Sequence, residues 1–220
     1  SRDERRDTCM ETFDYKKAYK DLYILKTKPM MIQVPSMNFV MVKGNGNPNE
    51  PDGAYANALQ ILYGISYTIK MSKKNSMHIK GYFDYVVPPL EGFWWMDDIQ
   101  GIDVTQKNSF HWYAFIRLPE FVNQEIFEWA CAQTQKKKPQ LDVSLAKFVT
   151  LEEGLCVQIM HKGCYDDEPA SIEKMHAFME AEGYELDFTG IYNTGQPRMH
   201  HEIYLSNPNK SKPENLKTVI

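Results

Sequence analysis

The chain has 220 residues, of which 43% are hydrophobic and 25% are charged, and its formal net charge at pH 7 is −4. These are ordinary globular proportions, and they exclude a disordered, collagen-like or coiled-coil chain. The slight acidic excess disfavours nucleic acid or an anionic membrane surface as the main partner, because both require a basic face. Aromatic residues are unusually frequent at 13%, so we expect them either to fill the core or to line a site.

The chain carries no pattern of a membrane protein or a secreted protein. No apolar run approaches the roughly 18 residues that a membrane span needs, and the N-terminus lacks the apolar region of a signal peptide. The four cysteines show no C-x-x-C spacing, which favours reduced thiols. We therefore expect a cytoplasmic protein in which residues 1–9 precede the natural start at Met10 and residues 1–30 form an N-terminal extension.

The first predicted elements are a strand and a helix. Residues 38–43 are rich in β-forming side chains and end in a turn rich in Gly and Asn, which predicts a strand followed by a loop. Residues 54–70 predict a helix, because their apolar side chains recur at the spacing of one buried helical face: Ala58, Ile61, Leu62, Ile65 and Ile69.

Two further β-type runs complete this first unit. They cover residues 81–87 and 112–118, and a proline follows each of them. The order predicts a strand-helix-strand-strand (βαββ) module over about 31–119. A linking helix at about 120–137 follows, because apolar residues again recur there at helical spacing.

The second half repeats the same order. Residues 155–162 predict a strand, and an acidic turn leads into a helix whose first residue is Pro169. Proline suits the first helical position, acidic residues near it complement the helix dipole, and Gly183 supplies the stop.

The fold class then follows from the repeat. A run at 188–192 and a strand at 199–205 complete a second βαββ module at about 145–208. We expect an α+β fold in which two pseudo-symmetric modules form antiparallel sheets, with helices on one side and a central ligand cleft. The single domain would span 31–208, and residues 209–220 would be a tail.

Alternation along the last predicted strand divides its side chains between two faces. One face, suited to the helix layer, takes His201, Ile203 and Leu205, and the other takes His200, Glu202 and Tyr204. A carboxylate in the middle of a strand is disfavoured. Glu202 therefore belongs either to the solvated face of an edge strand or to a site.

Three motifs of this second half occur in a recognisable order. They are Gly-Cys-Tyr-Asp-Asp-Glu-Pro at 163–169, Glu-Gly-Tyr at 182–184 and Glu-Ile-Tyr-Leu at 202–205. Together they resemble the GyrI-like small-molecule-binding domains, which also form the effector-binding halves of some multidrug-sensing transcription regulators. The resemblance implies a cleft between two modules with a glutamate among aromatic rings at its base. With no recognition helix for DNA in view, the chain resembles a stand-alone bacterial member.

The resemblance makes Glu202 the cleft carboxylate and Tyr165 a hydroxyl near it. The most aromatic segment, residues 90–97, has no clear family counterpart, and we expect a loop that forms a lid or wall of the site or, alternatively, packs against the core. The expected ligand contacts are Glu202, Tyr165, Trp94, Trp95, Trp112, Tyr113, Tyr85, Tyr204, Met160, Phe93 and His200.

Such an aromatic pocket suits hydrophobic, planar and cationic compounds, because ring faces attract cations and one carboxylate complements their charge. The expected role is multidrug-type binding and drug resistance. The resemblance also implies an alternative, a hydrolase of cyclopropane-bearing DNA alkylators, in which Glu202 would position water and Tyr165 would polarise the conjugated carbonyl. A third reading is an interaction module that shields a target such as a topoisomerase.

We expect no cofactor and no metal site. His200, His201 and Glu202 suggest metal ligands, but neighbours on a strand point to opposite faces, so at most two could act together. The chain has no nucleophile elbow, dinucleotide fingerprint or phosphate-binding loop. The expected partners are small aromatic molecules, with no nucleic acid and no membrane, and a homodimer stays open.

Overall fold

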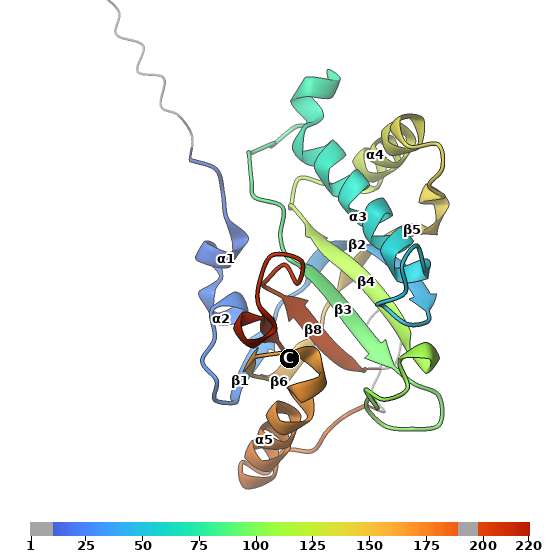
Figure 1. The fold of residues 1–220 in the computed structure, drawn as a ribbon. Coiled ribbons are helices and arrows are strands. Elements are labelled where there is room, and N and C mark those ends of the chain that lie inside the picture. Colours follow the sequence, from blue (N-terminus) through green and yellow to red (C-terminus); the bar gives the residue numbers. More distant parts are fainter. Residues whose placement is uncertain (1–10, 189–197) are drawn as a thin grey trace, which may run out of the picture.

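The computed structural model describes residues 11–188 and 198–220 (Figure 1). Seven strands form one antiparallel sheet in the order β5-β2-β4-β3-β8-β9-β7, and β1 pairs with β6 in a separate two-stranded ribbon. The strands of the sheet are β2 Met37–Asn45, β3 Leu90–Trp95, β4 His111–Leu118, β5 Ala146–Leu151, β7 Met160–Lys162, β8 His200–Tyr204 and β9 Lys217–Val219. The ribbon consists of β1 Met30–Val34 and β6 Gly154–Gln158, and the helices are α1 Tyr15–Ala18, α2 Lys20–Tyr23, α3 Ala54–Lys70, α4 Gln124–Lys137 and α5 Glu168–Ala181.

Two βαββ modules build the sheet, as the sequence predicts. The first runs β2-α3-β3-β4 and the second β7-α5-β8-β9 along the chain. In space their strands are ordered β2-β4-β3 and β8-β9-β7, so each module has the same internal order and the two meet at the antiparallel pair β3–β8. The modules therefore share one continuous sheet whose pseudo-twofold seam lies between Trp94 and His200.

The second strand of the first module, counted along the chain, differs from the prediction. Residues 81–87 contain no strand, and Tyr85 makes only an isolated bridge with Phe13. The strand is β3, the segment that the sequence analysis assigned to a loop. Pro88 and Pro89 have no N–H for a central ladder, whereas β3 is paired on both sides and buried along most of its length.

The second module carries the same kind of shift. The predicted run 188–192 lies outside the described residues except for its first position. The strand predicted at 199–205 is β8, and it is the second strand of its module along the chain, not the third. The third strand is β9, which lies within the expected tail 209–220 and pairs with both β7 and β8. Three residues are too short a pattern to reveal a strand in the sequence.

Helices α3 and α4 cover one face of the large sheet (Figure 1). The predicted apolar stripe of α3 is buried there, with Ile61, Leu62, Ile65 and Ile69 all at 0% exposure. They pack against inward-facing side chains of β2, β4 and β3, such as Val40, Ala114 and Trp94. Asn123 caps α4 by accepting a hydrogen bond from the backbone N–H of Ile126.

The two faces of β8 are exchanged relative to the prediction. Residues directly opposite in a ladder share a face, and Trp94, which packs under α3, lies opposite His200. His200, Glu202 and Tyr204 are therefore on the helix-covered face of the sheet. Ile203 packs instead with Tyr15 and other residues of the N-terminal segment. Part of the expected extension 1–30 thus covers the sheet and supplies the apolar layer for the opposite face.

Candidate functional site

A cavity of about 500 Å³ is lined by the β1–β6 ribbon, α5 and residues of β8. This volume is in the range of small-molecule pockets. Aliphatic and thioether side chains form most of its walls, among them Leu22, Ile32, Val34, Ile172, Met175 and Met179. Proline at the start of α5 and the buried positions Met175 and Met179 fix the helix that closes one side.

The charged side chains that border this cavity are mainly acidic. The carboxyl groups are Glu91, Glu153, Glu173, Glu185 and Asp187. Among the described lining residues, Arg198 is the one Arg or Lys, and its guanidinium donates to the backbone carbonyls of Glu153 and Leu155. The electrostatic potential inside should therefore favour a positively charged guest over a negatively charged one.

Two of these carboxyl groups flank one imidazole. His201 Nδ1 lies 2.9 Å from Glu153 Oε2, and its Nε2 lies 2.8 Å from Glu91 Oε1. Burial alone would lower the pKa of His201, but Glu153 and Glu91 raise it to about 10, so the ring is an imidazolium. Burial raises the pKa of Glu91 despite the opposing effect of His201. Glu91 and Glu153 are 2% and 7% exposed, so the cavity wall holds a desolvated charged network.

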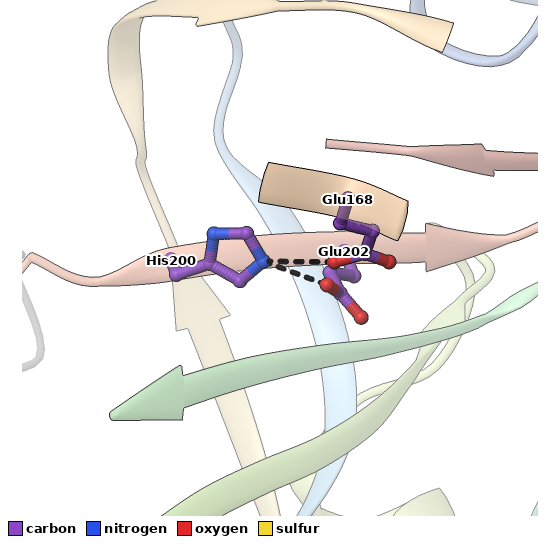
Figure 2. Close-up of side chains that lie close together, drawn as sticks. All are labelled: Glu168, His200 and Glu202. Atoms are coloured by element: carbon purple, nitrogen blue, oxygen red, sulfur yellow. Dashed lines mark hydrogen bonds and ion pairs between the residues drawn. The ribbon is translucent and has the colours of Figure 1, made fainter. Parts of the chain in front are cut away.

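A second cluster lies on the other face of β8 (Figure 2). His200 Nε2 is 2.7 Å from Glu202 Oε2 and 3.8 Å from Glu168 Oε2. Strand alternation predicts that His200 and Glu202 share a face. Glu168 is the first residue of α5, so the start of that helix adds a third side chain to this pair. All three residues are buried, and His200 also borders the cavity.

The two carboxyl groups of this cluster hold different protonation states. Burial would raise the pKa of Glu202, but hydrogen bonds with Glu168, His200 and Tyr204 lower it to about 2. Burial and the neighbouring Glu202 raise the pKa of Glu168 well above its ordinary value. Without any other cation, Glu168 therefore keeps a proton and Glu202 is ionised.

Aromatic side chains surround Glu202. Tyr204 donates its hydroxyl to Glu202 Oε1 at 2.8 Å, and Trp94 Nε1 donates to the Tyr204 hydroxyl at 2.8 Å. The rings of Tyr165 and Tyr204 meet edge to face at 5.9 Å. Burial, Glu202 and Glu168 raise the pKa of Tyr165 to about 12, so this phenol stays neutral at ordinary pH.

The remaining expected ligand contacts are distributed over three packing clusters. Trp112 lies in the core under α3, and Phe93 and Tyr113 lie in the core on the opposite face. Trp95 stacks on Tyr113, and Tyr85 and Met160 pack with the N-terminal segment. Of all the sequence-predicted ligand contacts, His200 alone borders the cavity within the described part of the chain. The expected aromatic cage is thus not the lining of this cavity.

The sequence reasoning missed Glu91, Glu153 and Glu168. Glu91 offered a signal, since it is a lone carboxylate inside an otherwise apolar run. Glu168 directly precedes Pro169, and it looked like an ordinary acidic residue at a helix start. Glu153 belongs to an acidic pair in a turn, a pattern that is common on surfaces.

The comparisons with known proteins agree with this architecture. The model of the GyrI-like small molecule binding domain family matches residues 27–220. The chain belongs to this family. The resemblance drawn from the three sequence motifs is therefore confirmed, and the family match includes β9.

Solved structures from Listeria innocua are similar to this GyrI-like chain. One, described as a hydrolase, has 46% sequence identity and a TM-score of 0.82, and the match covers 94% of this chain and 97% of that one. Another, described as an uncharacterized conserved protein, has 46% identity, a TM-score of 0.85 and the same coverage. None of the curated proteins matches the chain. Within the described residues, no helix is long and apolar enough to cross a membrane.

Proposed function

We propose that this GyrI-like protein binds hydrophobic, planar, cationic aromatic compounds in the cavity between α5 and the β1–β6 ribbon. The acidic lining is the observation that supports this most. Glu91, Glu153, Glu173, Glu185 and Asp187 border a largely aliphatic cavity, and the His201 imidazolium between Glu91 and Glu153 balances only part of this charge. In a bacterial cytoplasm, such binding would lower the free concentration of toxic lipophilic cations.

The physical basis is the cost of moving a charge out of water. A cation that enters an apolar cavity loses hydration, and nearby carboxylates compensate that loss. A neutral analogue gains only the apolar contact, and an anion is repelled. Met175 and Met179 line the wall with flexible thioether side chains, which lets the cavity accept ligands of different outline.

A fluorescence titration tests this proposal. A lipophilic dye cation should bind saturably and at least about tenfold more tightly than a neutral dye with the same ring system, since hydrogen bonds and contacts to charged groups contribute about 1.5–3 kcal/mol. Glu153→Gln should weaken cation binding and leave the neutral dye unaffected. Glu180→Gln is the matched control, because Glu180 is an exposed residue of α5 outside the lining.

Two results would overturn the proposal. One is the absence of saturable binding for several dye cations. The other is equal affinity for the cation and its neutral analogue in the wild-type protein, because the acidic lining would then have no role in selection.

A second candidate function is hydrolysis of cyclopropane-bearing DNA alkylators. It is supported by the description of a 46% identical Listeria innocua protein as a hydrolase and by the acid–base cluster next to the cavity. In this reaction Glu202 would take a proton from water as the water oxygen bonds to a ring carbon. The ring bond would break toward the conjugated carbonyl, whose oxygen would be stabilised by the Tyr165 hydroxyl and then protonated.

Mass spectrometry decides between binding and turnover. With protein far below the concentration of the alkylator, a hydrolase produces many equivalents of a product heavier by one water. Glu202→Gln should abolish that product, whereas Glu180→Gln should form it at the wild-type rate. If the alkylator disappears no faster with protein than in buffer, the hydrolase proposal is wrong and the binding proposal is unaffected.

A further inference from the structure

We infer that Glu168, His200 and Glu202 form a binding site for a divalent transition metal, with Zn²⁺ as the best fit. Each residue offers one ligand atom, and these atoms all lie within 4.8 Å of one another. Figure 2 shows the imidazole of His200 directed at both carboxyl groups. This inference is independent of which compound the neighbouring cavity accepts.

The separations of the ligand atoms suit a small cation. Tetrahedral zinc with bonds of about 2.0–2.1 Å places its ligand atoms about 3.3 Å apart. The two separations from His200 Nε2, 2.7 Å to Glu202 and 3.8 Å to Glu168, lie on either side of this value. The mean of the two separations is therefore close to the spacing that zinc needs.

One carboxylate oxygen of the cluster has no hydrogen-bond partner. Glu168 is 5% exposed, and its Oε1 makes no hydrogen bond within the part of the chain that the structure describes. Buried polar atoms without a partner are rare in proteins and suggest an unseen ligand. A divalent cation would match the charge of these two neighbouring carboxylates once both are ionised.

The surroundings favour a transition metal over Mg²⁺ or Ca²⁺. A mixed set of one imidazole and two carboxylates is typical of zinc and its neighbours, whereas the harder cations prefer oxygen ligands alone. Tyr204 donates to Glu202 Oε1, and Trp94 donates to Tyr204, so outer hydrogen bonds orient this carboxylate. Three protein ligands leave one position for water, and His200 borders the cavity through which an ion could enter.

Titration calorimetry of the full chain with ZnCl₂, after treatment with a chelator, tests the inference. We expect one Zn²⁺ per chain, a raised thermal midpoint, and far weaker binding of MgCl₂. Glu168→Gln keeps the shape of the side chain and should weaken Zn²⁺ binding at least tenfold. His176→Ala removes an exposed histidine from the same helix and should bind Zn²⁺ as the wild type does.

Several results would overturn the inference. They are no binding of Zn²⁺, unchanged affinity in Glu168→Gln, or an equal loss in His176→Ala, which would reveal an adventitious surface site. Should Glu168→Gln fail to fold, Co²⁺ added to the wild-type protein gives the answer. A site with a histidine and two carboxylates predicts the strong visible absorption of four-coordinate Co²⁺, and the weak spectrum of hydrated Co²⁺ would contradict it.

Discussion

His200 and His201 are neighbours in the chain, yet each joins a separate set of carboxyl groups on opposite faces of the sheet. His200 contacts Glu202 and Glu168 on the face that α3 covers, whereas His201 lies between Glu91 and Glu153 on the opposite face. Strand alternation alone separates the two rings. The strand β8 therefore presents one charged cluster to each side of the molecule, and the two clusters can be tested independently.

Replacing His201 by alanine should lower the free energy of unfolding by about 3–5 kcal/mol, because it leaves buried carboxyl groups without their imidazolium. Urea denaturation followed by circular dichroism measures this. His176→Ala, an exposed histidine, should change the value by less than about 0.5 kcal/mol. A loss below about 1 kcal/mol for His201→Ala would mean that the network contributes little to stability.

Replacing Tyr85 by phenylalanine should leave stability at neutral pH unchanged or raise it by about 1 kcal/mol. The Tyr85 hydroxyl is buried and has no hydrogen-bond partner among the described residues, so its removal ends a desolvation cost. Dye binding should not change, because Tyr85 does not border the cavity. A clear loss of dye affinity would show that Tyr85 contributes to the binding site.

The same variant should also resist alkali better than the wild type. Burial raises the pKa of Tyr85 above its ordinary value of 10. A raised folded-state pKa gives a stabilising contribution that is present below pH 10 and is lost as the pH rises beyond it. The unfolding midpoint of Tyr85→Phe should thus fall less steeply between pH 10 and pH 12, and an identical slope in both proteins would contradict this assignment.

Gly44→Ala should destabilise the protein by about 1–3 kcal/mol through overpacking. A Cβ at this position would meet ring atoms of Trp112 at 2.3–2.9 Å, and Trp112 is 1% exposed, so the indole has little room to move. Lys43→Ala, at the exposed neighbouring position, is the control and should cost less than about 1 kcal/mol. Equal thermal midpoints for Gly44→Ala and the wild type would show that the indole can shift.

Filling the cavity should abolish much of the dye binding. Ile172 of α5 lines the cavity. Ile172→Trp should reduce affinity for a dye cation at least tenfold while the protein stays folded. Trp95→Phe should leave the affinity unchanged, because Trp95 stacks on Tyr113 away from the cavity. If Trp95→Phe weakened dye binding and Ile172→Trp did not, the aromatic cage that the sequence suggested would be the binding site.

The sequence by itself determined the long helices, the alternation along the last predicted strand and the family. The apolar spacing of residues 54–70 determines α3, since a helix of this length is recognised by its own periodicity. Pro169 and Gly183 mark the limits of α5 closely. The alternation along 199–205 correctly places His200 and Glu202 on one face, because a strand's period of two is a local property.

Only the tertiary structure decided which strands pair and which side chains meet. The sequence predicts a loop at 90–95, and the segment becomes a strand only because β4 and β8 pair with it on its two sides. Glu91 and His201 contact each other across 110 residues of chain, and Glu168 reaches Glu202 from the start of another element. Such contacts depend on how the two modules pack, and packing between distant segments leaves no periodic trace in either segment.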